Sequence, residues 1–358
     1  MTRTDTLHVL GRARLLAVAA IALAMCPMAA IAGDWLARVA DDRMVCRLSI
    51  PGTHDAATGE GWDCADSLAA NLIARTQELT LAQQWAAGIR AFDLRPDVRT
   101  DSLGRQTLHI YHGEFATRAS MASVMGMLRD SLAAHPSEFA IIVMRHEASA
   151  SRESARWKDM TDYVLAKNRD LLVDFRPDIT VGQLRGRILV LSRDVYNDSM
   201  PRGGYIEGWR HDAECDWTRP ATVRGSSRNG HLVVQDFYDM SGEGGMPTKL
   251  GAIERLFRLT GKGEVLRADP HTWFINHTSG YLYTTQQFGG DPVSTTKGYR
   301  ANAAETNRWM ANLIEAKRSR GRSATTGIVM MDFGGADRSG GQEVLGRRLV
   351  NTIIDSNW

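Results

Sequence analysis

Five side chains that can move protons or hold a phosphate follow short apolar runs of the sequence. His54 and Asp55 come just after "VCRLSI", Arg95 ends "IRAFDLR", His112 ends "TLHIYH", and Asp332 ends "TGIVMMD". Two histidines can act as general base and general acid, and an arginine can stabilise negative charge that develops on a phosphate. A carboxylate behind the base histidine fixes its tautomer and supports its charged form. These residue types predict phosphodiester cleavage if the fold brings them together.

Each of these residues also has a structural explanation when it is taken alone. A single histidine after a strand often packs in the core, and Arg95 could form a surface ion pair of little energetic weight. Asp332 could cap a helix near the glycine-rich turn "FGGADRSGGQE". The functional interpretation depends on the recurrence of such residues at the ends of successive runs.

Eight short β-prone runs recur along the chain, and several are continuously apolar, as expected of buried parallel strands. Besides the four runs above, they are "FAIIVMRHE", "RILVLSR", "HLVVQDF" and "TWFINH". Helices are predicted over residues 66–88, 120–138, 152–173 and 303–321, and Ser120 is a candidate N-cap.

This alternation predicts an α/β protein with an irregular (distorted) TIM-type (βα)8 barrel in a single domain, residues 33–358. The second and third runs are too close together for a full helix, so we expect distortion there. The carboxyl ends of barrel strands share one mouth, which is where the polar residues would meet.

The first 32 residues have the layout of a secretory signal peptide. Three arginines in "MTRTDTLHVLGRAR" precede the apolar stretch "LLAVAAIALAMCPMA", and "AIA" offers small residues for cleavage near Ala32–Gly33. We therefore expect a secreted protein, extracellular or periplasmic. A lipoprotein signal ending at Cys26 is an alternative, although Met25 occupies a position that usually holds a smaller residue.

The charge and cysteine content exclude several classes of protein. Removal of the leader removes three arginines and one aspartate, which leaves no net charge, so nothing favours a nucleic-acid partner. Cys46, Cys64 and Cys215 remain, and a disulfide between Cys46 and Cys64 would fix the His54 loop. The odd count leaves one thiol unassigned. The sequence lacks CxxC and HExxH patterns, so it does not indicate a structural zinc site.

Four segments resemble the bacterial phosphatidylinositol-specific phospholipase C family, of the X-domain type. They are "SIPGTHDAAT", "GIRAFDLR", "YHG" and "GIVMMDF", in this order between Leu48 and Phe333. Members of the family have an irregular (βα)8 barrel, which agrees with the predicted strands. The resemblance implies a phosphatidylinositol diacylglycerol-lyase that releases diacylglycerol and inositol 1,2-cyclic phosphate. We expect it to act as a monomer on a membrane phospholipid, either phosphatidylinositol or a glycosylated inositol lipid.

The resemblance assigns a catalytic role to each of the five residues. His54 is similar to the general base that deprotonates the inositol 2-hydroxyl, and Asp332 to the residue that orients this base. Arg95 is similar to the phosphate-binding arginine. His112 is similar to the general acid, and Asp55 to its helper near the leaving group. Attack within the inositol ring would benefit from proximity.

Head-group residues follow from the resemblance in the same way. "VVQDFY" resembles the segment in which an aspartate and a tyrosine, here Asp236 and Tyr238, hold the inositol ring, and residues two apart on a strand share a face. Arg193 resembles an inositol-binding arginine. Where the family has a lysine, this sequence reads "VMRHE", so Arg145 or His146 must replace it. Alternation allows only one of these two to face the mouth.

The presence of Arg95 predicts catalysis without a metal or other cofactor. In calcium-dependent relatives a carboxylate stands near that position, and a bound cation would be repelled by the guanidinium. Two alternatives remain open. One is a metal-dependent glycerophosphodiester phosphodiesterase-like enzyme, which a chelator would inhibit; the other is a catalytically inactive barrel that binds inositol lipids.

Aromatic residues in two later segments suit a lipid interface. The candidates are Tyr205, Trp209, Trp217, Trp273, Tyr281 and Tyr283. Packing in the core is an equal alternative for each of them.

Overall fold

The structure is a computed structural model that describes residues 33–358, with the exception of residues 66, 149–153, 198–201, 242–243, 289–290 and 297. The signal peptide predicted over residues 1–32 lies outside the described residues and stays a prediction. Within the described part of the chain, no helix has the length and apolar character that a membrane crossing requires.

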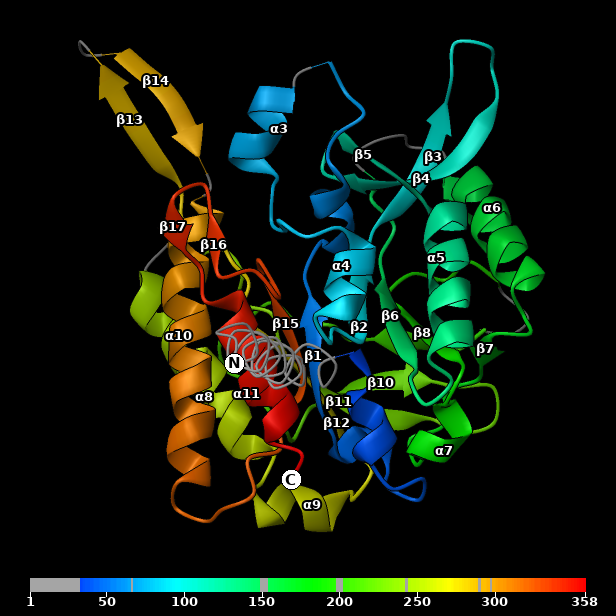
Figure 1. Ribbon diagram of the computed structural model, residues 1–358, viewed down its shortest axis with the longest axis vertical. Coiled ribbons are helices and arrows are strands. Elements are labelled where there is room, and N and C mark those ends of the chain that lie inside the picture. Colours follow the sequence, from blue (N-terminus) through cyan, green and yellow to red (C-terminus); the bar gives the residue numbers. More distant parts are fainter. Residues whose placement is uncertain are drawn as a thin grey trace, which may run out of the picture.

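A closed barrel forms the centre of the molecule (Figure 1). Among the described residues, nine strands make up this ring, in the order β6–β2–β1–β15–β12–β11–β10–β9–β8 and back to β6. Eight of them are parallel, and β10 runs antiparallel to both β9 and β11. The ring consists of β1 (Ser49–Thr53), β2 (Ala91–Leu94), β6 (Ala140–Met144), β8 (Ile188–Ser192), β9 (Gly204–Glu207), β10 (Ala221–Arg224), β11 (Gly230–Gln235), β12 (Trp273–His277) and β15 (Gly327–Met331).

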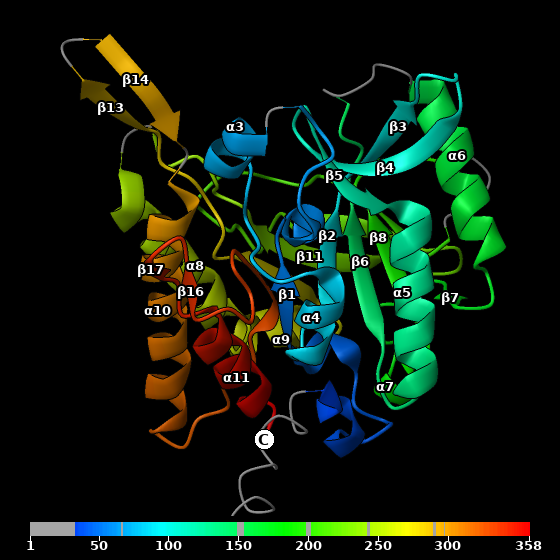
Figure 2. The same ribbon diagram turned by 45° about the horizontal axis from the view of Figure 1, so that its top comes forward.

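Helices cover the outside of the barrel and the two ends carry further short elements (Figure 2). β1, β6, β8, β12 and β15 are buried along their whole length, which explains why most of them read as apolar runs. The α-helices are α3 (Ser67–Ile73), α4 (Leu81–Ala86), α5 (Met121–Ala134), α6 (Ser154–Lys167), α7 (Val181–Leu184), α8 (Gly245–Leu259), α9 (Gly263–Ala268), α10 (Tyr299–Arg318) and α11 (Gly346–Asp355). The 3₁₀ helices are η1 (Trp35–Arg38), η2 (Val45–Arg47) and η3 (Ala56–Glu60).

The remaining strands lie outside the ring. β7 (Leu172–Val173) pairs with β8, and β16 (Arg338–Ser339) pairs with β17 (Gln342–Glu343). The hairpin β13 (Thr284–Phe288) and β14 (Asp291–Thr296) projects from the upper end of the molecule in Figures 1 and 2.

The predicted barrel is confirmed, but the third of its predicted strands is wrong. "TLHIYH" belongs to β4 (Gln106–His112), which forms a separate antiparallel sheet with β3 (Pro96–Thr100) and β5 (Phe115–Ser120). β4 alternates between buried and less buried residues, as a strand with one face towards solvent does. β9 and β10 take part in the ring although the sequence did not reveal them, because each has only four residues and includes polar ones.

Three predicted helices are confirmed as α5, α6 and α10, and Ser120 caps α5 in a reciprocal capping box with Ser123. The helix predicted over residues 66–88 is instead split into α3 and α4. The irregular stretch between them brings the buried Thr76 and Gln77 under the His54 loop, where Gln77 Nε2 donates to the His54 carbonyl oxygen at 2.8 Å. The break therefore supports the segment that follows β1.

The disulfide considered between Cys46 and Cys64 is not formed, since both cysteines are free. Cys46 lies in η2 before β1, whereas Cys64 follows the opposite end of that strand. A five-residue strand spans roughly 15 Å, so it keeps the two thiols apart.

A buried ion pair lies before β2 and β6, and its carboxylate also accepts from the Leu36 N–H near the start of the described chain, at 3.1 Å. Arg90 and Glu138 are both fully buried, with Arg90 Nε 2.9 Å from Glu138 Oε2. We predict that Glu138→Ala lowers the free energy of unfolding by about 3–5 kcal/mol, because it leaves the buried guanidinium without its carboxylate. Urea denaturation measures this loss, and a loss below about 1 kcal/mol would contradict it.

Candidate active site

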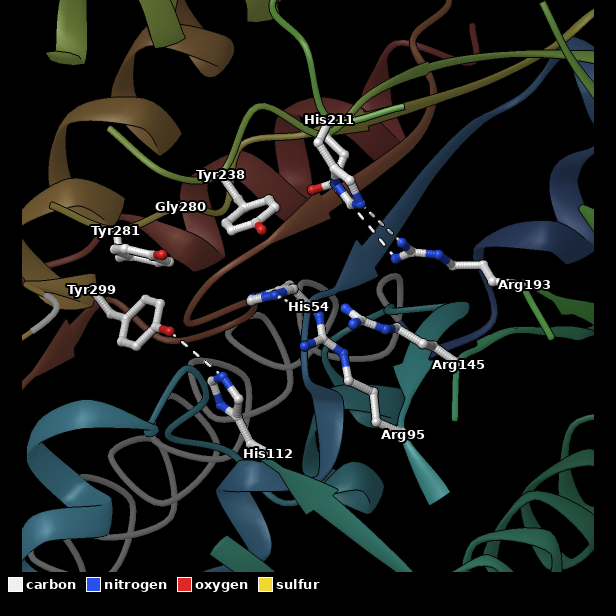
Figure 3. A pocket seen from close by; sticks show the side chains of 11 residues that line it. His54, Arg95, His112, Arg145, Arg193, His211, Tyr238, Gly280, Tyr281 and Tyr299 are labelled. Carbon is white, nitrogen blue, oxygen red and sulfur yellow. Dashed lines mark hydrogen bonds and ion pairs between the residues drawn. The ribbon is translucent and has the colours of Figure 1, made fainter. Parts of the chain in front are cut away.

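The site is a pocket at the carboxyl ends of the barrel strands, with a volume of about 240 Å³ (Figure 3). Most of its polar residues come directly after a strand or one to three residues beyond it. The lining comprises His54, Arg95, His112, Arg145, Arg193, His211, Asp236, Tyr238, Gly280, Tyr281 and Tyr299. Seven of the ten predicted site residues therefore line the pocket, and Asp55, Asp332 and His146 do not.

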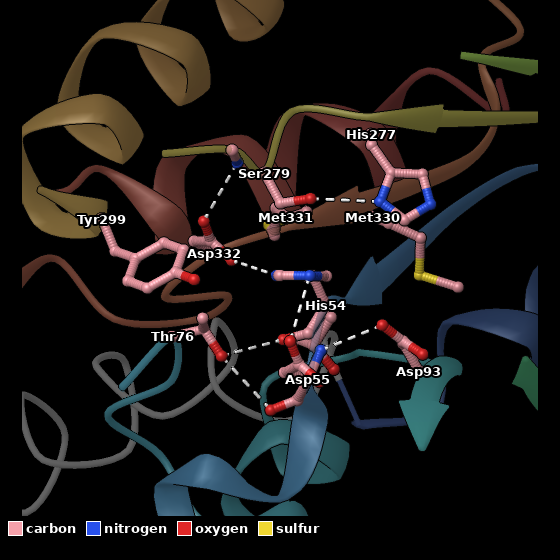
Figure 4. Close-up of polar contacts among 12 residues, drawn as sticks. His54, Asp55, Thr76, Asp93, His277, Ser279, Tyr299, Met330, Met331 and Asp332 are labelled. Atoms are coloured by element: carbon pink, nitrogen blue, oxygen red, sulfur yellow. Dashed lines mark hydrogen bonds and ion pairs between the residues drawn. The ribbon is translucent and has the colours of Figure 1, made fainter. Parts of the chain in front are cut away.

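His54 follows β1 and is paired with a carboxylate from the neighbouring strand (Figure 4). The register sets Thr53 beside Met331, so the next residues, His54 and Asp332, are adjacent. His54 Nδ1 lies 2.9 Å from Asp332 Oδ1, and both side chains are buried. The carboxylate accepts the Nδ1 proton, which leaves Nε2 to exchange a proton with a substrate.

Asp55 lies between the two histidines and the arginine. Its Oδ2 is 3.1 Å from His54 Nε2 and 3.3 Å from His112 Nε2, and its Oδ1 is 2.9 Å from Arg95 Nε. Its backbone is left-handed, with φ of 44°, and its N–H donates to Asp93 Oδ2 at 3.2 Å. Aspartate tolerates this conformation better than most residues, and the backbone hydrogen bond holds it there. The carboxylate can therefore act on either histidine.

Arg95 is held by a cluster of carboxylates. Its guanidinium contacts Asp55, donates to Asp93 Oδ2 at 3.0 Å, and lies 3.8 Å from Glu147 Oε2. Burial disfavours its charge, but Asp55 and Asp93 outweigh that effect and hold the pKa of Arg95 well above its ordinary value. The Arg95 guanidinium is thus fixed and fully charged next to His54, with its Nη2 3.0 Å from His54 Nε2.

His112 reaches the pocket from β4, outside the barrel. Its Nδ1 is 2.6 Å from the Ala74 carbonyl oxygen, so Nδ1 carries a proton and Nε2 faces the site. A second proton on Nε2 creates an imidazolium whose charge Asp55 can balance, as a general acid requires. The rings of His54 and His112 have centroids 6.2 Å apart, and both side chains line the same pocket.

Three of these groups could also hold a metal ion. His54, Asp55 and Asp93 offer ligand atoms within 4.8 Å of one another. The guanidinium of Arg95 already contacts both carboxylates, so it neutralises the charge that a cation would use. These three side chains therefore suit the Arg95 guanidinium better than a metal ion, and the reaction proposed for the site requires no metal.

A second group of side chains surrounds Asp236 at the other side of the pocket. Asp236 Oδ2 accepts from Trp209 Nε1 at 2.8 Å, and it lies 3.0 Å from His211 Nδ1 and 3.9 Å from Arg193 Nη1. Burial alone would raise the pKa of Asp236, but His277, His211 and Arg193 outweigh it and hold that pKa far below its ordinary value. Tyr238 lines the same wall and is partly exposed, as a residue that stacks on a sugar-like ring would be.

The register settles which of Arg145 and His146 faces the pocket. Arg145 lines it (Figure 3). His146 points away, with Nε2 2.9 Å from Asp97 Oδ1 and its ring stacked on Trp157 at 4.4 Å between centroids. His146 is therefore a packing residue here, and only Arg145 can take the place of the family's lysine.

Sequence reasoning missed three residues that line the pocket: Gly280 and two with titratable side chains, Tyr299 and His211. Tyr299 begins α10, and its hydroxyl lies 3.5 Å from His112 Nε2. His211 follows β9, a strand that the sequence did not reveal, within "GWRHDAE". The only signal for either residue was its position near a segment rich in aromatic residues.

The pH dependence of catalysis follows from the two carboxylates beside His54. Burial and Arg95 favour its neutral form, but Asp55 and Asp332 outweigh them and raise the pKa of His54 to about 9. A base must be neutral, so in the wild type kcat/KM rises with pH until His54 has lost its proton.

We predict that Asp332→Asn moves this acid limb to lower pH by about one pH unit or more, because one of the carboxylates that raise the pKa of His54 is lost. The maximal rate also falls, by about 100-fold, since the ring loses its orienting partner. Profiles of kcat/KM between pH 5 and 10 measure both effects. A limb that stays in place or moves to higher pH would show that Asp332 does not act on His54.

Comparisons with known proteins found relatives that share one name. No family model matches the chain. A 1-phosphatidylinositol phosphodiesterase of Listeria monocytogenes is 31% identical over 174 residues, which cover 45% of this chain and 49% of that protein. The enzyme of the same name from Staphylococcus aureus is 23% identical over 337 residues, which cover 90% of this chain and 94% of that protein. The alignment thus spans about half the length of the first relative and nearly all of the second.

Solved structures show the same fold. A phosphatidylinositol-specific phospholipase C from Staphylococcus aureus has a TM-score of 0.66 at 18% identity, covering 91% of this chain and 98% of its own. The corresponding Listeria monocytogenes structure has a TM-score of 0.63 at 23% identity, covering 91% and 99%.

The fold defines a class, the single-domain TIM-type barrels with their reactive groups at the carboxyl ends of the strands. Within that class, these curated homologues and structural neighbours are bacterial phosphatidylinositol-specific phospholipases C, which confirms the resemblance seen in the sequence.

Proposed function

We propose that this protein is a phosphodiesterase that cleaves phosphatidylinositol to diacylglycerol and inositol 1,2-cyclic phosphate. The observation that carries the proposal is the convergence of His54, Arg95 and His112 on one pocket, with Asp332 behind the first histidine. Relatives that align with most of the chain are named for this activity.

The geometry supports a two-step reaction. In the first step His54 Nε2 takes the proton of the inositol 2-hydroxyl while its oxygen attacks phosphorus. Arg95 stabilises the charge on the phosphate oxygens, and the glycerol oxygen leaves with a proton from His112 Nε2. In the second step water opens the cyclic phosphate, and the two histidines exchange roles.

The mouth of the barrel is the side that we propose faces a lipid surface. α3, the β3–β4 hairpin and the β13–β14 hairpin each come after the carboxyl end of a barrel strand, and they lie at the same end of the molecule (Figure 2). Leu68 and Leu103 on two of these elements are 71% and 75% exposed, and Tyr283 is also exposed. By contrast Tyr205 and Trp273 are buried, so they serve the core. The same proposal includes cleavage of a signal peptide near Ala32–Gly33, export, and action as a monomer.

A lipid assay tests the proposal directly. We predict release of diacylglycerol from phosphatidylinositol in mixed micelles and at least 100-fold slower release from phosphatidylcholine, which has no hydroxyl next to the phosphate to attack it. Excess EDTA leaves the rate on phosphatidylinositol unchanged, because Arg95 occupies the place of a cation. Inhibition by EDTA that calcium or magnesium reverses would instead favour the metal-dependent phosphodiesterase.

A further inference from the structure

Three arginines stand in a row at the mouth of the barrel. β2, β6 and β8 are neighbours, and their last residues are in register. The next residue on each strand is an arginine: Arg95, Arg145 and Arg193. The Arg145 N–H donates to the Leu94 carbonyl oxygen at 3.1 Å, and the Arg193 N–H to that of Met144 at 2.8 Å, so the register continues through the row.

The row lies across the pocket, and all three side chains line it (Figure 3). Neighbouring strands are about 4.8 Å apart, so three adjacent positive charges repel one another unless anions lie between them. What the pocket can bind therefore depends on which of the three guanidinium groups is already balanced by a carboxylate of the protein.

Among the residues that the structure describes, two members of the row have a carboxylate beside them. Arg95 is balanced by Asp55, Asp93 and Glu147. Arg193 lies 3.9 Å from Asp236.

The charge of Arg193 is only partly balanced. Asp236 is shared with Trp209 and His211, and the Arg193 guanidinium stacks on the Trp209 ring at 4.2 Å. Burial lowers the pKa of Arg193 to about 10, and the nearby charges of Arg145 and Arg95 add to that effect.

Arg145 has no such partner. Its side chain is partly buried and makes no hydrogen bond or ion pair with any residue that the structure describes. A cation in that position lacks the compensation that partly buried charges normally have. The corner of the pocket between Arg145 and Arg193 therefore carries excess positive charge.

We infer that the pocket takes an inositol lipid whose ring bears a second phosphate, and that Arg145, with Arg193 beside it, binds this phosphate. The inference rests on the proposed function, and the scissile phosphate remains with Arg95, His54 and His112. A phosphate monoester carries nearly two negative charges and accepts the planar fork of an arginine in two parallel hydrogen bonds. Ring hydroxyls alone would leave the charge of Arg145 unbalanced.

The test compares phosphatidylinositol with phosphatidylinositol 4-phosphate and 5-phosphate, each in mixed micelles of the same detergent. The measured quantity is the ratio of kcat/KM on the better phosphorylated lipid to kcat/KM on phosphatidylinositol. We expect a ratio of one or more for the wild type. Arg145→Gln lowers this ratio about tenfold or more, because it removes hydrogen bonds to a charged group. Arg145→Lys, which keeps the charge, retains more of the ratio than Arg145→Gln does.

Arg258→Gln is the matched control, since Arg258 lies on α8 with its side chain 76% exposed and outside the pocket. It leaves the ratio unchanged. A wild-type ratio below one, or a ratio that is the same in Arg145→Gln and wild type, overturns the inference while the proposed function stands. Failure to cleave any of the three lipids overturns the proposed function instead.

Discussion

His54→Ala lowers kcat/KM on phosphatidylinositol by about 10,000-fold, the upper end of what a single general base contributes. The substitution removes the only nitrogen base that is both oriented by a buried carboxylate and adjacent to the phosphate-binding arginine among the described residues. Asp55 cannot replace it, because its carboxylate is engaged by Arg95. His112 cannot replace it in the first step, because that step already uses His112 as the acid for the leaving oxygen. Steady-state kinetics across a range of lipid concentrations measures the loss.

His135→Ala provides the matched control for a histidine paired with an aspartate. His135 Nδ1 lies 2.6 Å from Asp34 Oδ1 on the protein surface, away from the pocket. We expect the His135→Ala variant to keep wild-type kinetics, and circular dichroism to show that both variants are folded. If folded His54→Ala retains more than about a tenth of wild-type kcat/KM, His54 is not the base.

Arg95→Ala lowers both activity and stability. Activity falls about 1,000-fold, because the fork that stabilises the phosphate charge is lost. The free energy of unfolding at neutral pH falls by about 3–5 kcal/mol, because buried carboxylates around it lose their counter-charge. Burial already raises the pKa of Asp55 to about 7, and loss of Arg95 raises it further; the pKa of Asp93, which Arg95 helps to hold at about 2, rises as well. Folded pKa values raised in this way mean that the variant regains stability as pH falls and the carboxylates become protonated.

Arg95→Lys separates the two effects. Lysine keeps a positive charge among the carboxylates and so restores most of the stability, but it lacks the planar fork and leaves activity reduced about 100-fold. Urea denaturation at pH 5 and pH 7, together with lipid kinetics, distinguishes these results. Equal activity in Arg95→Lys and wild type would show that Arg95 supplies charge alone.

The sequence predicted the barrel because buried parallel strands are continuously apolar, and the runs of β1, β6, β8 and β15 are of this kind. The prediction failed for β4, because over six residues a half-exposed strand with aromatic and aliphatic residues has a pattern similar to that of a buried barrel strand. His112 still reaches the pocket, because the β3–β5 sheet begins directly after β2 and folds over the same end of the barrel. A residue that lines the pocket was thus reached from a wrong strand assignment.

Residues of the candidate site could be predicted from the sequence where the functional side chain directly follows a strand. His54, Arg95, Arg193 and Asp332 are of this kind. Tyr299 and His211 could not be predicted, because their place in the pocket depends on tertiary structure. Tyr299 is the first residue of α10, and His211 lies in the loop after β9, a strand that the sequence did not reveal. The choice between Arg145 and His146 required the register of β6 against its neighbours, which a single sequence does not contain.

We propose that His54 drives attack by the inositol 2-hydroxyl without a metal ion. Phosphorus NMR of the protein acting on phosphatidylinositol micelles in excess EDTA tests this most directly. We expect a signal from inositol 1,2-cyclic phosphate that accumulates before any acyclic inositol phosphate. Turnover that yields only the acyclic product, or that requires added calcium or magnesium, would contradict it.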